Sequence, residues 1–181
     1  MPPKPKVILK LVTLGDPGTG KTSLIQQFVN RAFKHSYSIT IGLDVLSKSI
    51  KLQDREVELS INDIGGQQRF ATMRQLFYTG SNLAMFVYDS TRPQTLANVE
   101  SVWFRELSQF CPPRPNAPEV MKILIGNKVD LVDLRSVSDE EGAKVASRMG
   151  CDHILASAKE NKNVDEAFTT LTKGYLDKFD K

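Results

Sequence analysis

The chain has 181 residues, of which 40% are hydrophobic and 25% are charged, and its formal net charge is +3. This length and composition are ordinary for one globular domain with a substantial core, which we expect to span residues 1–181. The lysines and arginines are scattered, and no basic run is long enough to indicate a nucleic-acid partner. A small anionic ligand is equally compatible with the mild positive charge.

Two further features bear on the cellular compartment. The chain has two cysteines, Cys111 and Cys151, which makes a disulfide framework implausible and favours reduced thiols in a cytoplasmic protein. No apolar run approaches the roughly 18 residues of a membrane span. We therefore expect neither a secreted protein nor an integral membrane protein.

The first predicted elements form a strand, a helix and a hairpin. Residues 7–14 are an apolar run that ends at a glycine, which predicts a buried strand. Apolar residues at helical spacing predict a helix from 21 to about 31. Alternation over 57–61 predicts a half-exposed strand, which pairs through the Q-D-R-E turn with a strand that begins near residue 43.

The middle of the chain predicts two buried strands, at 83–88 and 121–125, with a helix over 96–110 between them. The segment C-P-P-R-P-N-A-P at 111–118 has four prolines and must be a loop. These elements alternate in the order expected for strands that lie parallel in one sheet.

The last third predicts a capped helix, a short strand and a final helix. Ser138 and Glu141 have the spacing of a capping box, and Gly150 is a suitable helix stop. Residues 153–156 predict the last strand, and apolar residues over 164–175 predict the last helix.

Strands that alternate with helices of this length predict an α/β fold. We expect a mostly parallel six-stranded sheet with one antiparallel edge strand and helices on both faces. Ligands of such sheets bind beyond the carboxyl ends of the strands.

A phosphate-binding loop is predicted where the first strand ends. The pattern G-x-x-x-x-G-K-T follows a strand and opens a helix, so its backbone N–H groups and the helix N-terminus can face phosphate oxygens. The alternative is an ordinary glycine turn with a surface lysine. The residues expected to contact the phosphates are Gly15, Asp16, Pro17, Gly18, Thr19, Gly20, Lys21, Thr22 and Ser23.

A guanine-recognition motif is predicted where the fifth strand ends, in Asn127-Lys128-Val129-Asp130. The Asp130 carboxylate can accept two hydrogen bonds from the N1 and N2 hydrogens of guanine, whereas adenine has no such donor pair. Lys128 can lay its aliphatic stem along the base. The segment Ser157-Ala158-Lys159 ends the last strand and can offer a backbone N–H to the guanine oxygen.

Five motifs in order resemble those of one family. G-D-P-G-T-G-K-T, Y-S-I-T-I-G-L-D, D-I-G-G-Q-Q-R-F, G-N-K-V-D and S-A-K have the order and near spacing of a small GTPase of the Ras superfamily, and the Rab branch is the most similar. The resemblance spans about residues 7–179. It implies the small G domain of P-loop NTPases, GTP and GDP as ligands, Mg²⁺ as cofactor, and hydrolysis of GTP.

The resemblance assigns further residues by position. Phe33 matches the aromatic that packs against guanine, and Tyr37 matches the tyrosine that covers the phosphates. Gly66 matches the glycine that senses the γ-phosphate, and Gln67 matches the catalytic residue that positions the attacking water. Three residues would hold Mg²⁺, directly or through water: Thr22, Thr40 and Asp63. The alternative for the aromatics is a core or surface role.

The second switch segment departs from the Rab pattern W-D-T-A-G-Q-E. Asn62 replaces the tryptophan and Val45 replaces a phenylalanine, whereas Phe77 keeps an aromatic, so two members of a surface aromatic cluster that effectors read are missing. The Ile64-Gly65 pair is similar to the Arf branch. We expect familiar Rab effectors to bind poorly, because aromatic residues carry much interface energy.

Pro17 is another departure, because family members mostly carry glycine or a small residue nearest the γ-phosphate. Proline has no N–H and has a fixed φ, so the N–H at this position must be expendable. We expect intrinsic hydrolysis to survive and activator-stimulated hydrolysis to be altered; the alternative is a harmless variation.

The chain is therefore expected to be a monomeric molecular switch, in trafficking or signalling, with an exchange factor, a GTPase-activating protein and effectors as partners. Two alternatives are a non-hydrolysing scaffold that holds its nucleotide and a small-molecule kinase. The last residues, K-F-D-K, contain no prenylation cysteine. Either the native C-terminus is longer and carries a prenylated tail that makes the protein a peripheral membrane protein, or the protein is not prenylated and is cytoplasmic.

Overall fold

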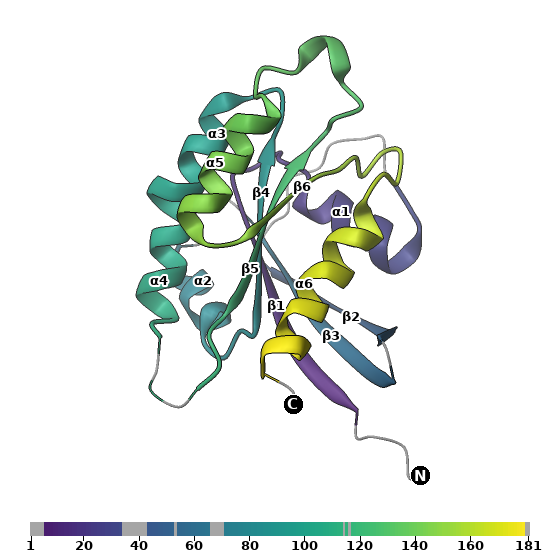
Figure 1. Cartoon of the computed structure of the whole chain (residues 1–181), viewed down its shortest axis with the longest axis vertical. Coiled ribbons are helices and arrows are strands. Elements are labelled where there is room, and N and C mark those ends of the chain that lie inside the picture. Colours follow the sequence, from purple (N-terminus) through teal and green to yellow (C-terminus); the bar gives the residue numbers. More distant parts are fainter. Residues whose placement is uncertain are drawn as a thin grey trace.

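The computed structural model describes residues 6–33, 43–52, 54–65, 71–113, 115 and 117–179. A six-stranded sheet forms its centre (Figure 1), in the order β2-β3-β1-β4-β5-β6. β2 pairs antiparallel with β3, and every other neighbouring pair is parallel, which confirms the predicted fold class. The strands are β1 (Val7–Leu14), β2 (Leu43–Leu52), β3 (Arg55–Ile64), β4 (Leu83–Asp89), β5 (Met121–Asn127) and β6 (Asp152–Leu155).

Helices cover both faces of the sheet, as Figure 1 shows. One face packs against α1 (Lys21–Asn30) and α6 (Val164–Phe179). The other face packs against α2 (Ala71–Tyr78), the helical run over 93–110, and α5 (Asp139–Met149). A short 3-10 helix, η3 (Val132–Leu134), follows β5.

The helix predicted over 96–110 is a single run with an unexpected centre. It consists of α3 (Pro93–Asn98), a π-helical segment η2 (Val99–Phe104) and α4 (Arg105–Phe110). Val99, the first residue of this π-helical segment, and Trp103, near its end, are both buried. The spacing of apolar residues predicted the buried face, but it could not reveal a local change in helical period.

The predicted ends of α5 are confirmed. Ser138 caps the helix by accepting a hydrogen bond from the backbone of Glu141, whose side chain accepts one from the Ser138 backbone N–H. Gly150 ends it in the left-handed conformation, with φ 64°. The helix therefore begins and ends where its local sequence satisfies the unpaired backbone groups.

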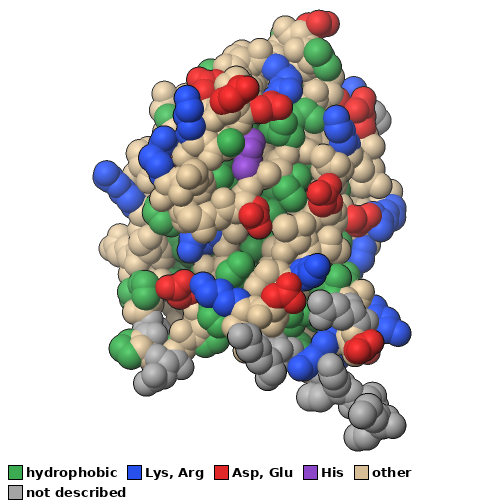
Figure 2. Space-filling model, in the orientation of Figure 1, with side chains coloured by type: hydrophobic (Ala, Val, Ile, Leu, Met, Phe, Trp, Pro, Cys, Tyr) green, Lys and Arg blue, Asp and Glu red, His purple; other side chains and the backbone are tan. Residues whose placement is uncertain are grey.

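The charged side chains on the face shown in Figure 2 are of mixed sign, with acidic and basic groups interspersed. Within the part of the chain that the structure describes, no helix is both long enough and apolar enough to cross a membrane. At the surface, the Arg148 guanidinium lies 2.6 Å from Glu100, and its hydrogen bonds hold the pKa of that carboxyl below its usual range.

Candidate functional site

Three loops meet at the carboxyl ends of β1, β5 and β6. Asn127, the last residue of β5, joins them: its Nδ2 donates to the Thr19 carbonyl at 2.9 Å, and its Oδ1 accepts from the Ala158 backbone N–H at 3.2 Å. Asn127 is 1% exposed. The predicted phosphate loop and the two predicted guanine loops are therefore brought together by one buried amide.

The first loop, residues 15–20, needs glycine at both ends. A Cβ on Gly15 would lie 2.2 Å from the Val87 carbonyl oxygen, and a Cβ on Gly20 would lie 2.2 Å from Asn127 Nδ2. Both residues also have positive φ, 147° and 94°. Any side chain at either position would therefore displace the neighbouring strand ends and strain the loop.

Lys21 opens α1 from inside the loop. Its ammonium donates to the Gly15 carbonyl at 2.8 Å and to the Asp16 carbonyl at 3.0 Å, and the residue is 6% exposed. Burial lowers the pKa of Lys21 to about 8. An anion beside this buried ammonium would favour its charged form and raise the pKa, so the loop fits a phosphate group.

Thr22 and Asp63 form a second pair at the edge of the loop. The Thr22 hydroxyl donates to Asp63 Oδ2 at 2.5 Å, while Asp63 Oδ1 is buried and has no hydrogen-bond partner among the described residues. Burial raises the pKa of Asp63 despite the Thr22 hydrogen bond and the nearby Lys21 charge. A buried carboxylate with an unsatisfied oxygen fits a divalent cation or its bound water.

No cluster of acidic, histidine or cysteine side chains could by itself hold a metal ion in the described part of the chain. A cation at Asp63 would therefore depend on hydroxyl, phosphate and water oxygens. Those are the ligands that Mg²⁺ commonly takes at nucleotide sites.

The guanine-recognition residues are tied to their neighbours. The Ser157 hydroxyl donates to Asp130 Oδ1 at 2.6 Å. Lys128 has a left-handed backbone, with φ 68°, and its ammonium donates to Asp89 Oδ2 at 2.7 Å. Lys159, in contrast, is exposed. The contacts with Ser157 and Asp89 therefore orient the side chains of Asp130 and Lys128.

Other predicted positions lie at the margins. Ser23 is half-buried in the first turn of α1, and Phe33 is half-buried against the apolar residues under α1 and α6. The predicted residues Tyr37, Thr40, Gly66 and Gln67 lie outside the described residues.

Asp16 has a partner set that sequence reasoning missed. Its carboxylate accepts from Trp103 Nε1 at 2.8 Å and from Asn98 Nδ2 at 2.7 Å, so it faces the helical run over 93–110. Any contact of Asp16 with phosphate would thus come from its backbone. The sequence separation of more than 80 residues left no local signal for this contact.

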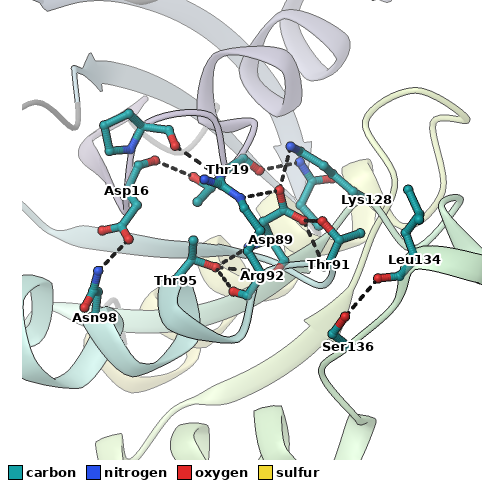
Figure 3. A network of polar contacts seen from close by, with 12 residues as sticks. Asp16, Thr19, Asp89, Thr91, Arg92, Thr95, Asn98, Lys128, Leu134 and Ser136 are labelled. Carbon is teal, nitrogen blue, oxygen red and sulfur yellow. Dashed lines mark hydrogen bonds and ion pairs between the residues drawn. The ribbon is translucent and has the colours of Figure 1, made fainter.

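Asp89 and Arg92 were also missed (Figure 3). Asp89 ends β4 and is 1% exposed, and its Oδ2 accepts from both Lys128 and Arg92. The Arg92 guanidinium also donates to the carbonyl of Pro17, at 3.1 Å. The sequence could have indicated Asp89, because this acid lies at the carboxyl end of a buried strand, as Asn127 does.

The position of Asn62 differs from the prediction of a surface residue. It is 4% exposed on β3, and its Nδ2 lies 3.3 Å from the Leu11 carbonyl. Val45, its cross-strand neighbour, is 53% exposed, and Phe77 is partly buried in the core under α2. Asn62 is drawn inward because its amide can hydrogen-bond the β1 backbone, so it does not contribute to a surface cluster.

Comparison with known proteins gives consistent matches. The model of the Ras family matches residues 10–177. Rab-1 of Theileria annulata is 37% identical over 171 residues, which cover 94% of this chain and 76% of the relative. The GTP-binding protein ypt2 of Schizosaccharomyces pombe is 39% identical over 92% of this chain and 80% of its own, and Rab-8A of chicken is 36% identical over 96% and 81%.

Proposed function

This chain belongs to the Ras family and is similar to its Rab members, and from that premise we propose how its own residues carry out a nucleotide-controlled switch. As a Ras-family GTPase it binds guanine nucleotide and hydrolyses GTP. The assignment of individual residues to these tasks is our proposal. It rests mainly on Asn127, which joins the phosphate loop to both guanine loops.

The phosphate loop would bind the nucleotide through its backbone and Lys21. Lys21 turns from the carbonyl oxygens of Gly15 and Asp16 toward the β and γ phosphates, whose charge offsets the cost of burying its ammonium. Asp130, held by Ser157, accepts the N1 and N2 hydrogens of guanine. Lys128 covers the base with its stem while its ammonium stays on Asp89.

The metal site would be made by Thr22, Thr40 and Asp63. Bound Mg²⁺ supplies positive charge that screens the phosphate oxygens and supports departure of the γ-phosphate. Thr22 would contribute its hydroxyl, and Asp63 would orient water through Oδ1, which has no hydrogen-bond partner among the described residues. Thr40 is assigned from its place in the sequence alone.

Hydrolysis would use Gln67 to position the attacking water, while Thr40 and Gly66 detect the γ-phosphate. Loss of that phosphate would release switch I, about residues 33–43, and switch II, about residues 64–78. Intrinsic turnover should be slow, on the order of 10⁻⁴ to 10⁻² s⁻¹, because no arginine in the sequence is evidently placed to stabilise the transition state in cis.

Partners of this switch would be an exchange factor, an activating protein and effectors, because Ras-family GTPases work with all three. The Rab-like sequence supports a role in membrane trafficking. With Val45 in place of an aromatic and Asn62 buried, the surface presented by β2 and β3 should select different effectors from those of typical Rab proteins.

Base specificity gives a direct test of the site. Asp130→Asn replaces a double acceptor by an amide with one acceptor and one donor, which matches xanthine and no longer matches guanine. Purified variant and wild type would be titrated with GDP and xanthosine diphosphate. A preference for the xanthosine nucleotide in the variant alone supports the assignment, whereas unchanged GDP affinity contradicts it.

A further inference from the structure

Arg92 occupies a fixed place between the two halves of the nucleotide site. It is the N-cap residue of α3, and its backbone carbonyl accepts from the Thr95 N–H at 3.0 Å and from the Thr95 hydroxyl at 2.7 Å. The Thr95 hydroxyl also accepts from the Asp89 N–H at 2.9 Å. The backbone from which the guanidinium extends is therefore held firmly to the end of β4 (Figure 3).

The Arg92 guanidinium makes two contacts in different directions. Its Nε donates to Asp89 Oδ2 at 3.0 Å, and its Nη2 donates to the Pro17 carbonyl oxygen at 3.1 Å. The side chain is 46% exposed, whereas that of Asp89 is 2% exposed. A half-exposed ion pair alone would contribute little, so the second contact, to the phosphate loop, is the informative one.

Asp89 passes this contact on to the guanine-recognition loop. Its Oδ1 accepts from the Thr91 N–H at 2.9 Å and from the Thr91 hydroxyl at 2.7 Å, which fix the carboxylate. Its Oδ2 accepts from Lys128 at 2.7 Å as well as from Arg92. Asp89 Oδ2 thus connects Lys128, the lysine of N-K-V-D, with Arg92, which contacts the phosphate loop.

The charge of Arg92 also acts within the phosphate site. Burial is the main cause of the low pKa of Lys21; the charges of Asp63 and Asp16 raise that pKa, and the smaller effects of Arg74 and Arg92 lower it. A phosphate group placed beside Lys21 and Arg92 would attract both positive charges and so offset their mutual repulsion. The Asp16 carbonyl is held from within the loop by the Thr19 hydroxyl, at 2.9 Å, and Arg92 adds a contact from outside the loop at the next residue, Pro17.

We infer that Arg92 is a positioning residue that ties the phosphate loop to the guanine-recognition loop through Asp89 and thereby slows nucleotide dissociation. The inference rests on the proposed function, because it assigns Lys128 and residues 15–22 to one nucleotide. Release requires both loops to leave the ligand, and the Pro17–Arg92–Asp89–Lys128 connection opposes the opening of either loop alone.

The test measures release of N-methylanthraniloyl-GDP into excess unlabelled GDP. Arg92→Ala should dissociate about three- to tenfold faster than wild type, the range expected for the net loss of an ordinary hydrogen bond from a half-exposed side chain. Arg92→Lys keeps the charge, but an ammonium cannot bind Asp89 and the Pro17 carbonyl at once as a guanidinium does. Its release rate should therefore lie between those of wild type and Arg92→Ala. Arg148→Ala, which removes another half-exposed arginine ion pair, is the matched control and should release at the wild-type rate.

Two further measurements separate positioning from a general loss of structure. The thermal midpoint of GDP-saturated Arg92→Ala should match that of Arg148→Ala, while their release rates differ. In combination with Asp89→Asn, Arg92→Ala should add less than its own fold-change, because Arg92 acts through Asp89. Fold-changes that multiply fully would overturn the connection through Asp89.

Failure of the inference can be told from failure of the proposed function. A wild-type protein that does not bind the labelled GDP contradicts the nucleotide site itself. A wild-type protein that binds it, with Arg92→Ala and Arg92→Lys both releasing at the wild-type rate, contradicts only the role of Arg92. If Arg92→Ala does not fold, Arg92→Lys decides the question: release faster than wild type supports the role of Arg92, and release at the wild-type rate contradicts it.

Discussion

The two faces of the central sheet are built from different interactions. Under α1 and α6 the core is apolar, and Phe28 stacks on Phe168 with ring centroids 3.9 Å apart. Under α2 and the helical run over 93–110, the core includes Arg74, which is 2% exposed and binds Glu106 through two nitrogens. The Arg74 guanidinium also lies 5.0 Å from the centre of the Trp103 ring.

The face under α2 and the helical run over 93–110 contacts the phosphate loop through hydrogen bonds, whereas the face under α1 and α6 packs through apolar side chains. Trp103 binds Asp16 in the phosphate loop, and Arg74 lies on α2, which belongs to the proposed switch II. Apolar packing is non-directional and dense, whereas hydrogen-bonded pairs are directional and can exchange partners. We therefore expect the α2 face to respond to the nucleotide and the α6 face to remain unchanged.

The largest expected effect is on the apolar face. Phe168→Ala removes a fully buried ring from its stacking partner and should lower the free energy of unfolding by about 3–5 kcal/mol. Urea unfolding of the GDP-bound protein measures this loss. Leu76→Ala is the control, because Leu76 is 73% exposed and its truncation should change stability by no more than about 0.5 kcal/mol. Equal losses in the two variants would contradict the assignment of the core.

Arg74→Met should cost less, about 2–3 kcal/mol, which is below the cost of breaking a fully buried ion pair. Glu106 would lose its cation but remain 21% exposed to water and bonded to the Tyr78 hydroxyl, at 2.6 Å. The double variant Arg74→Met with Glu106→Gln should recover part of the loss, since it leaves no unpaired charge. A double variant less stable than Arg74→Met would show that the pair is not the source of the cost.

Trp103→Phe should lower stability by about 1–2 kcal/mol, because it removes the hydrogen bond to Asp16 while keeping an aromatic ring. Trp103 is also the sole tryptophan, so its fluorescence reports on the phosphate loop. Exchange of GDP for a non-hydrolysable GTP analogue should change the wild-type emission. Identical spectra in the two states would contradict a responsive α2 face.

The smallest effect on stability is expected for Asp63→Asn at the edge of the site. Burial raises the pKa of Asp63 above its ordinary value of 3.8. The folded state therefore binds this proton more tightly than the unfolded state, so ionisation of Asp63 lowers stability as pH rises from about 4 through the raised pKa. Without nucleotide or Mg²⁺, the variant should be as stable as wild type at pH 7 or more stable, because it does not bury a charge at this position.

Urea unfolding of nucleotide-free protein between pH 4 and pH 7 measures that difference. The same variant should lose the ability of Mg²⁺ to slow GDP release, because Asp63 would no longer orient metal-bound water. A variant that is less stable than wild type in the absence of ligands, with Mg²⁺ still effective, would contradict the proposed use of Asp63.

The sequence predicted those parts of the molecule whose causes are local. The strands follow from apolar runs and alternation, α5 follows from its cap residues, and the phosphate loop follows from glycine positions before a helix. The Asn127 motif could be placed at a strand end for the same reason. These features depend on residues within a few positions of one another, where hydrogen bonding and periodicity leave a pattern.

The features that escaped prediction depend on distant partners. Asp16 was expected at the phosphates, but its side chain binds Trp103, 87 residues away. Asn62 was expected on the surface, but it turns inward because the β1 backbone offers an acceptor. Arg92 was given no role from the sequence, because its partner in the phosphate loop, Pro17, is 75 residues away. Neither composition nor spacing records which residues the sheet order makes neighbours.

The measurement that tests the account most directly is single-turnover hydrolysis by protein loaded with GTP and Mg²⁺, followed as the ratio of GDP to GTP over hours. We predict slow decay in wild type and in Arg148→Ala, and its loss in Gln67→Leu, which keeps nucleotide binding but removes the group that positions water. GTP that is retained without decay by the wild type would contradict an intrinsically cycling switch. Decay that persists in Gln67→Leu would contradict the catalytic role of Gln67.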